Sequence, residues 1–521
     1  MNPPLRRRRV LQLAGLAAGA TVTGIGLTGC GEQAGESMTS DLPLPEPFTV
    51  ALPVPTVAVP DATDDGVDHY TVTQRAADIE ILPGVTTRVW GFDGRFPGPT
   101  FRARRGRPVT ITVVNTLPVP TSTHLHGGVT PSESDGLPTD LVVPDGLDFT
   151  PGAGAHMTVP AETWRLHPVR RDYTYPNEQR AATLWYHDHR MDFTAPQVWR
   201  GLAGMYLLGD DEEDSLGLPT GDRDIPLFVC DRAFTADGDF KYPARDDTLL
   251  SEPGTTGDYH RGVEGDIILV NGAPWPRMEV VGGRYRFRVL NAANARRFAL
   301  SLDPPPAHGP AFVQVGTDQG LLAAPVERDE LTISPGERYD LLVDFSRYRP
   351  GSTVTLQNAL GNDRTAAVMR FVVGRTEPVE DLPSILADQE TLSPEQSVGD
   401  RVFRFERSSV GVHHYMWTIN GEPYDAAGSI ATVGLDTVEK WTFTSDFHHP
   451  VHVHLGHFQV LTRNGKPADD LEAGWKDTVD LRPLEVVEVL VRFSQHKGRY
   501  MMHCHNLEHE DMAMMANFDV A

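Results

Sequence analysis

The segment GFDGRFPGPTFRARRGRPVTITVVN, residues 91–115, sets the fold class of this 521-residue chain. A glycine-containing turn leads into one strand-like run, and a short link leads into a second run rich in Val, Ile and Thr. The pattern returns as NGAPWPRMEVVGGRYRFRVLN (271–291) and as INGEPYDAAGSIATVGLDTVEKWTF (419–443). Because long helical periodicities are missing, the three repeats predict an all-β protein built from three sandwiches in series.

Composition and charge support this organisation. The 48 glycines and 42 prolines are too many turn-formers for a helical bundle. Acidic, turn-rich stretches at 209–224 and 376–400 are candidate linkers, so we expect domains at 44–210 and 211–375, then a linker and a third domain within 376–521. The formal net charge of −25 argues against binding to nucleic acid or to an anionic membrane, since both need a basic face.

The N-terminus has the features of an export signal. Arg6 to Arg9 precede VLQLAGLAAGATVTGIGLTGC (10–30), a weakly apolar run without acidic residues, which resembles a twin-arginine signal over residues 1–29. Glycine and threonine interrupt the run too often for an 18-residue membrane span. LTGC (27–30) resembles a lipobox, so we expect an extracytoplasmic protein anchored through a lipid on Cys30; cleavage nearby and release into the periplasm or medium is the alternative.

Histidines gather in the first and third of the expected units. They form four pairs spaced i, i+2, which face the same side of a strand: His124/His126, His187/His189, His452/His454 and His503/His505. The middle unit has only His260 and His308, with no spaced pair. Any metal site is therefore expected between units one and three.

A second group of possible metal donors faces the other side of the same strands. After removal of the signal only Cys230 and Cys504 remain inside the chain, and Cys230, in the apolar run IPLFVC, is interpreted as a buried structural thiol. Cys504 lies between His503 and His505 and must face the opposite side of the strand. His449 lies three residues before His452, an odd number, so it must also face the side opposite to His452. These two residues would share a site on the far side, which His509 and a methionine could close after a turn. Two histidines, a thiolate and a weak thioether form the blue-copper arrangement, whereas zinc has no ordinary site with so many histidines beside one thiolate and one thioether.

The motifs HLHGG (124–128), WYHDH (185–189), HPVHVH (449–454) and HCHNLEHEDMAMM (503–515) make the chain resemble the multicopper oxidases. The resemblance is to the bacterial laccase and bilirubin-oxidase-like branch, and it implies three cupredoxin-like Greek-key domains and four copper ions. It also implies a ligand set: His449, Cys504, His509 and Met514 for type 1; His124 and His452 for type 2; His126, His187, His189, His454, His503 and His505 for the type 3 pair.

The resemblance also implies an activity. Single electrons would enter at the type 1 copper, and four of them would reduce dioxygen to two waters at the other three ions. This reduction consumes protons, and Asp135 and Glu510 match the family's acidic positions near those ions. His457 is not expected to be a ligand, because its parity opposes that of His454. Met512 and Met515 are expected to be packing residues.

The reducing substrate is the least constrained part of the prediction. We expect a monomeric oxidase of phenols and aromatic amines, including bilirubin-like or aminophenol donors. The alternative is a cuprous oxidase for copper tolerance, but the chain has no Met-rich insert of the kind such enzymes carry. A catalytically dead scaffold is disfavoured because every ligand is present. Copper-dependent nitrite reduction is disfavoured because the histidines come as eight paired residues.

Overall fold

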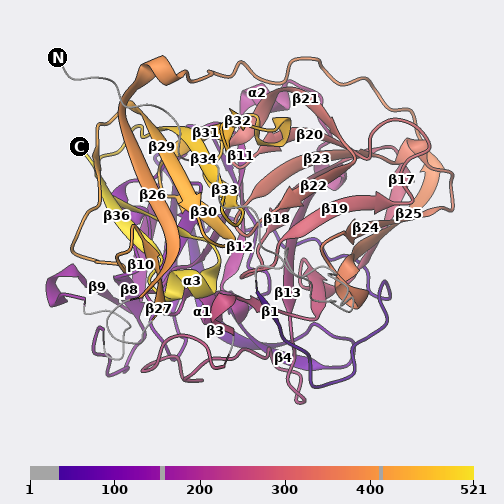
Figure 1. The fold of residues 1–521 in the computed structure, drawn as a ribbon. Helices are drawn as coiled ribbons and strands as arrows, with labels where there is room; N and C mark the ends of the chain where they lie inside the picture. Colours follow the sequence, from indigo (N-terminus) through magenta and orange to yellow (C-terminus); the bar gives the residue numbers. More distant parts are fainter. Residues whose placement is uncertain (1–34, 153–158, 258, 410–414) are drawn as a thin grey trace, which may run out of the picture. The chain divides into compact units, whose positions relative to one another are not determined.

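Strands make up most of the regular structure, and they build three pairs of sheets along the chain (Figure 1). The computed structural model describes residues 35–152, 159–257, 259–409 and 415–521. The expected signal at 1–29 and Cys30 lie outside these residues. The all-β prediction is confirmed, and among the described residues we found no helix with the length and apolarity needed to cross a membrane.

The first pair of sheets uses residues 62–209. One sheet has the order β10-β6-β3-β2, with β4 also paired to β3, and the other has the order β5-β12-β11-β7. Their strands are β2 (Ala62–Asp64), β3 (Val67–Glu80), β4 (Thr86–Phe92), β5 (Phe101–Arg104), β6 (Val109–Asn115), β7 (Thr123–His126), β10 (Arg170–Tyr175), β11 (Ala182–Asp188) and β12 (Ala203–Gly209). Val109, Ile111 and Val113 alternate along β6 with less buried residues, two threonines and one valine, as expected for a strand with one face in the core.

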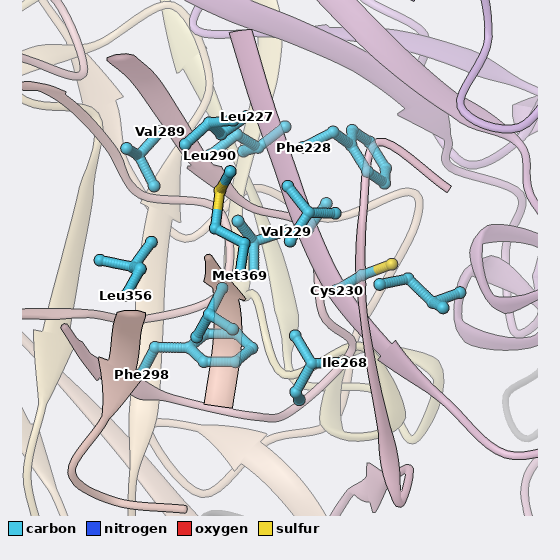
Figure 2. Close-up of a cluster of buried hydrophobic side chains, with 14 of the residues drawn as sticks. Leu227, Phe228, Val229, Cys230, Ile268, Val289, Leu290, Phe298, Leu356 and Met369 are labelled. Carbon is cyan, nitrogen blue, oxygen red and sulfur yellow. The ribbon is translucent and has the colours of Figure 1, made fainter. Parts of the chain in front are cut away.

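The middle pair uses residues 224–376, in the orders β16-β15-β13-β18-β23-β20-β21 and β17-β25-β24-β19-β22. Its strands are β13 (Asp224–Arg232), β15 (Ile267–Val270), β16 (Ala273–Pro274), β17 (Arg277–Gly282), β18 (Arg284–Asn291), β19 (Phe298–Asp303), β20 (Phe312–Thr317), β21 (Gly320–Arg328), β22 (Glu330–Ile333), β23 (Arg338–Asp344), β24 (Thr353–Asn358) and β25 (Ala367–Thr376). Figure 2 shows Cys230 within the buried side chains around β13, where its thiol is fully covered. Its interpretation as a buried thiol is confirmed.

The third pair uses residues 397–520, in the orders β27-β26-β29-β34-β31-β32 and β28-β36-β35-β30-β33. Its strands are β26 (Ser397–Ser409), β27 (Tyr415–Ile419), β28 (Thr432–Val433), β29 (Val438–Ser445), β30 (His449–Val453), β31 (His457–Arg463), β32 (Lys466–Pro467), β33 (Thr478–Leu481), β34 (Val486–Arg492), β35 (Gly498–Cys504) and β36 (Met515–Val520). Their core contains Trp441 and Phe518 from opposite sheets.

Two of the short helices, α1 (Thr194–Trp199) and α3 (Leu507–Asp511), join the first unit to the third. Helix α2 (Asp211–Asp214) and two small parallel pairs complete the fold, β1 (Glu36–Ser37) with β14 (Val263–Glu264) and β8 (Asp140–Val143) with β9 (Arg165–Pro168). α3 lies beside α1 (Figure 1), because the Asp511 carboxylate accepts hydrogen bonds from the backbone N–H groups of Thr194 and Ala195. This contact holds the C-terminal histidine motif against the first unit.

Candidate metal centre

Two strand pairs carry the spaced histidines into one buried cluster. β7 pairs antiparallel with β11 and places His124 opposite His187, while β30 pairs with β35 and places His452 opposite His503. The two pairs face each other: the Nε2 atoms of His124 and His452 are 3.4 Å apart, and those of His189 and His503 are 3.3 Å apart. All eight rings are buried. Four of them come from the first unit and four from the third, so the two units share the cluster.

The His124 and His452 rings direct their unprotonated nitrogens at each other, an arrangement that favours a bound cation. The Nδ1 atom of His124 lies 2.6 Å from the Asp135 carbonyl, and that of His452 lies 3.0 Å from the Asp477 carbonyl. Because a carbonyl oxygen can only accept, each ring carries its proton on Nδ1 and turns a bare Nε2 lone pair toward the other. Two lone pairs at this separation repel each other unless a positive ion lies between them.

The remaining six rings form two groups of three whose ligand nitrogens lie close together. His126, His187 and His505 make one group, and His189, His454 and His503 make the other; within each, the ligand atoms lie within 4.8 Å of one another. Several of these nitrogens are buried without a hydrogen-bond partner: His126 Nδ1, His187 Nε2, His189 Nδ1, His454 Nε2 and both nitrogens of His505. Orphaned buried polar atoms are costly, and a metal ion bound by each group would satisfy one nitrogen of each of its rings.

Burial also sets the charge state of these rings. Loss of solvent lowers the pKa of His126, His187 and His505 well below the ordinary value, and that of His189 to about 4. The imidazoles are therefore neutral near pH 7, which is the form that binds a metal.

A second group of donors lies on the other face of β30 and β35. The Cys504 Sγ atom is 3.5 Å from His449 Nδ1 and 3.6 Å from His509 Nδ1, and the two nitrogens are 3.1 Å apart. Met514 is fully buried in the same apolar cluster as Cys504, whereas Met515 belongs to a different one. Burial raises the pKa of the Cys504 thiol well above its usual value, and a bound cation would reverse this by stabilising the thiolate.

Two carboxylates contact the cluster directly. Asp135 Oδ2 lies 2.7 Å from His454 Nδ1, and Glu510 Oε2 lies 3.1 Å from His503 Nδ1. Burial raises the pKa of both side chains. The two acidic residues predicted from the sequence therefore touch the rings themselves. His457 belongs to none of the ligand groups among the described residues.

Several neighbours of the two sites were not found from the sequence. Asp477 Oδ1 lies 3.1 Å from His126 Nε2, and the Arg338 guanidinium pairs with the same carboxylate. Burial alone would raise the pKa of Asp477, but Arg338 and His126 outweigh it and hold the pKa well below the ordinary value. Trp417 covers His509, with ring centroids 3.9 Å apart. No spacing rule points to these residues, because their contacts join distant parts of the chain.

The donor set fits copper. Buried neutral imidazoles on one face, and two imidazoles, a thiol and a thioether on the other, match the nitrogen and soft sulfur ligands that copper prefers. Three residues in a row, His503, Cys504 and His505, connect the two faces through covalent bonds.

Comparisons with known proteins agree with this geometry. Two family models described as multicopper oxidase match residues 73–213 and 401–521. The laccase of Bacillus subtilis is 33% identical over 91% of this chain and 98% of its own length, and the bilirubin oxidase of Albifimbria verrucaria is 35% identical over 91% and 81%. The crystal structure of a laccase from Pediococcus acidilactici has a TM-score of 0.77 and 31% identity, covering 93% of this chain and 95% of that one.

Proposed function

The chain belongs to the multicopper oxidase family, as a copper-dependent oxidoreductase with dioxygen as acceptor, and we propose that its donors are small phenols or aromatic amines. Four donors each give up one electron, and dioxygen takes these four electrons and four protons to become two waters. The observation that carries the proposal is the pair of donor groups on opposite faces of β35, joined through Cys504. Laccase and bilirubin oxidase relatives support donors of this class.

We assign four copper ions to this chain. His449, Cys504, His509 and Met514 would hold one; His124 and His452 would hold another; the two groups of three histidines would hold a pair, namely His126, His187 and His505, and His189, His454 and His503. The chemistry that bound copper supplies is one-electron transfer and the reduction of dioxygen. The protein orients the rings through their second nitrogens and excludes bulk water by burying all of them.

The two carboxylates are assigned to proton delivery. Asp135 belongs to the first unit and Glu510 to the third, and each is about 1% exposed. Their carboxylates lie against the His454 and His503 rings of the cluster. A carboxyl group so placed can hold a proton next to the site where dioxygen is reduced and release it there.

Oxygen uptake by the purified full-length chain tests the donor class. We expect about four bound copper ions, and faster uptake with a dimethoxyphenol than with an equal concentration of Cu(I). Cys504→Ser serves as the control that keeps the cluster but loses the electron entry. Faster uptake with Cu(I) would favour the cuprous oxidase instead, and copper binding without uptake from either donor would identify a scaffold.

Export and anchoring are a separate proposal. The arginine-led N-terminal run and LTGC (27–30) support transport out of the cytoplasm and lipid attachment at Cys30. Metabolic labelling with palmitate should mark the full-length chain and leave a Cys30→Ala variant unmarked. Equal labelling of both would refute the anchor.

A further inference from the structure

The middle unit contributes no histidine to the cluster, yet its backbone packs directly against two of the rings. Gly336, in the turn before β23, has φ +85°, and a Cβ atom at this position would lie 3.0 Å from His505 Cδ2 and 3.1 Å from His126 Cε1. Only glycine combines this backbone conformation with so close an approach. The middle unit therefore forms one wall of the cluster.

Arg338, two residues later, is fully buried and uses its donors on all three units. Its Nε donates to the Thr183 carbonyl of the first unit at 2.8 Å. Nη1 and Nη2 donate to the middle unit at Gly336 and Asp318, at 2.9 and 3.0 Å. The same two nitrogens grip the Asp477 carboxylate of the third unit at 2.7 and 2.5 Å. Such a two-pronged pair fixes the plane of the carboxylate as well as its position.

Asp477 in turn holds one ring from each side of the cluster. Its Oδ1 lies 3.1 Å from His126 Nε2, which leaves His126 Nδ1 turned toward the ligand group. Its main-chain carbonyl lies 3.0 Å from His452 Nδ1, which leaves His452 Nε2 facing His124. Thr478, next in the chain, donates its hydroxyl to the same Oδ1 atom. One residue therefore decides which nitrogen of two different histidines is free to bind.

We propose that Arg338 is a positioning residue through which the middle unit orients Asp477, and so sets the His126 and His452 rings for copper. The proposal rests on the proposed function in taking copper as the ion that the cluster binds. Partners in contact with the second nitrogen of a ligand histidine typically change metal affinity 10- to 100-fold. A merely structural ion pair would change only the stability of the fold.

A matched pair of variants separates these two roles. Arg338→Lys keeps the charge but loses the two-pronged grip. Arg286→Lys makes the same change in the middle unit at another buried pair, where Arg286 binds Asp340 and Glu213. Both proteins are loaded with copper and dialysed against graded concentrations of a copper chelator. The blue absorption at Cys504 serves as an internal count of the separate site, and paramagnetic resonance reports the His124 and His452 site.

We expect Arg338→Lys to keep its blue absorption and to lose copper from the histidine cluster at chelator concentrations 10- to 100-fold lower than wild type. Arg286→Lys should match wild type in copper retention, whatever the change in its melting temperature. Equal retention of cluster copper by the two variants would overturn the proposal. If wild-type protein binds no copper at all, the proposed function fails rather than this assignment.

Asp477→Asn provides a second test that leaves Arg338 in place. It should lower cluster affinity too, and the double variant Arg338→Lys/Asp477→Asn should lose less than the product of the two single effects, because the residues act as one unit. Strictly independent effects would contradict the assignment. Full copper retention in Asp477→Asn would contradict it even if Arg338→Lys does not fold.

Discussion

Asp135→Asn tests whether this carboxyl group delivers protons or only holds a ring. In the wild-type chain His454 Nδ1 lies 2.7 Å from Asp135 Oδ2. Asparagine has nearly the same size, and its amide oxygen can accept the same hydrogen bond. The main-chain carbonyl that faces His124 is unchanged. In the state in which Asp135 has released its proton, exchanging the charged acceptor for a neutral one weakens the hydrogen bond by about 1 kcal/mol, or roughly fivefold in copper affinity. Loss of a proton donor costs far more, about 100- to 10,000-fold in rate.

The assay follows the two half-reactions separately. Reduction of the blue site by a phenol without oxygen should run near the wild-type rate, because Asp135 is not among the donors around Cys504. Rapid mixing of the fully reduced variant with dioxygen should show reoxidation slowed by about 100-fold or more. Glu133→Gln is the matched control, since Glu133 lies two residues away and is exposed.

Two results would refute this reasoning. Reoxidation at the wild-type rate with full copper content would show that Asp135 does not supply the proton. Copper loss well beyond the roughly fivefold change expected for a weakened hydrogen bond would show that its main role is to orient His454.

Three further changes have expected outcomes. Cys504→Ser should abolish the blue absorption and phenol oxidation while the cluster keeps its copper, since a hydroxyl is a hard, weak donor; visible spectra and metal analysis decide, and a blue variant would disprove the assignment. Met514→Leu should stay blue with a raised reduction potential in redox titration, because loss of the thioether disfavours Cu(II); an unchanged potential would point to Met512 or Met515. Cys230, fully buried with its pKa raised to about 11 by burial, should react with thiol reagents at pH 8 only upon unfolding, so rapid labelling of the native Cys30→Ala/Cys504→Ser protein, in which Cys230 is the one remaining thiol, would contradict its burial.

Strand periodicity explains why much of the site could be predicted. Residues at i and i+2 share a face whatever the tertiary fold, so the pairs at His124 and His452 are evident from spacing alone. The opposite parity of Cys504 and His449 follows from the same rule. Parity gives no information beyond β35, where His509 lies on α3 and Met514 follows it. The proximity of His509 in the chain suggested that it could close the site after a turn, and the choice of Met514 among the methionines came from the resemblance to a family.

Asp477 and Arg338 lay beyond prediction for a different reason. Their contacts join segments from three units, and the energy of a buried ion pair depends on partners that spacing in the chain does not encode. Gly336 lies two residues before Arg338, but a glycine in a turn before a strand has many ordinary explanations and does not indicate a contact with the cluster.

The alternation that makes the donors predictable also serves the chemistry. Because neighbouring residues on β35 point to opposite faces, Cys504 can belong to one site while His503 and His505 belong to the other. The two sites are then joined by a few covalent bonds, with no gap for an electron to cross through solvent. A helix would separate such neighbours by only about 100° and turn them partly toward the same side. A strand at the boundary between two buried sites is therefore the local structure that best connects electron entry with dioxygen reduction.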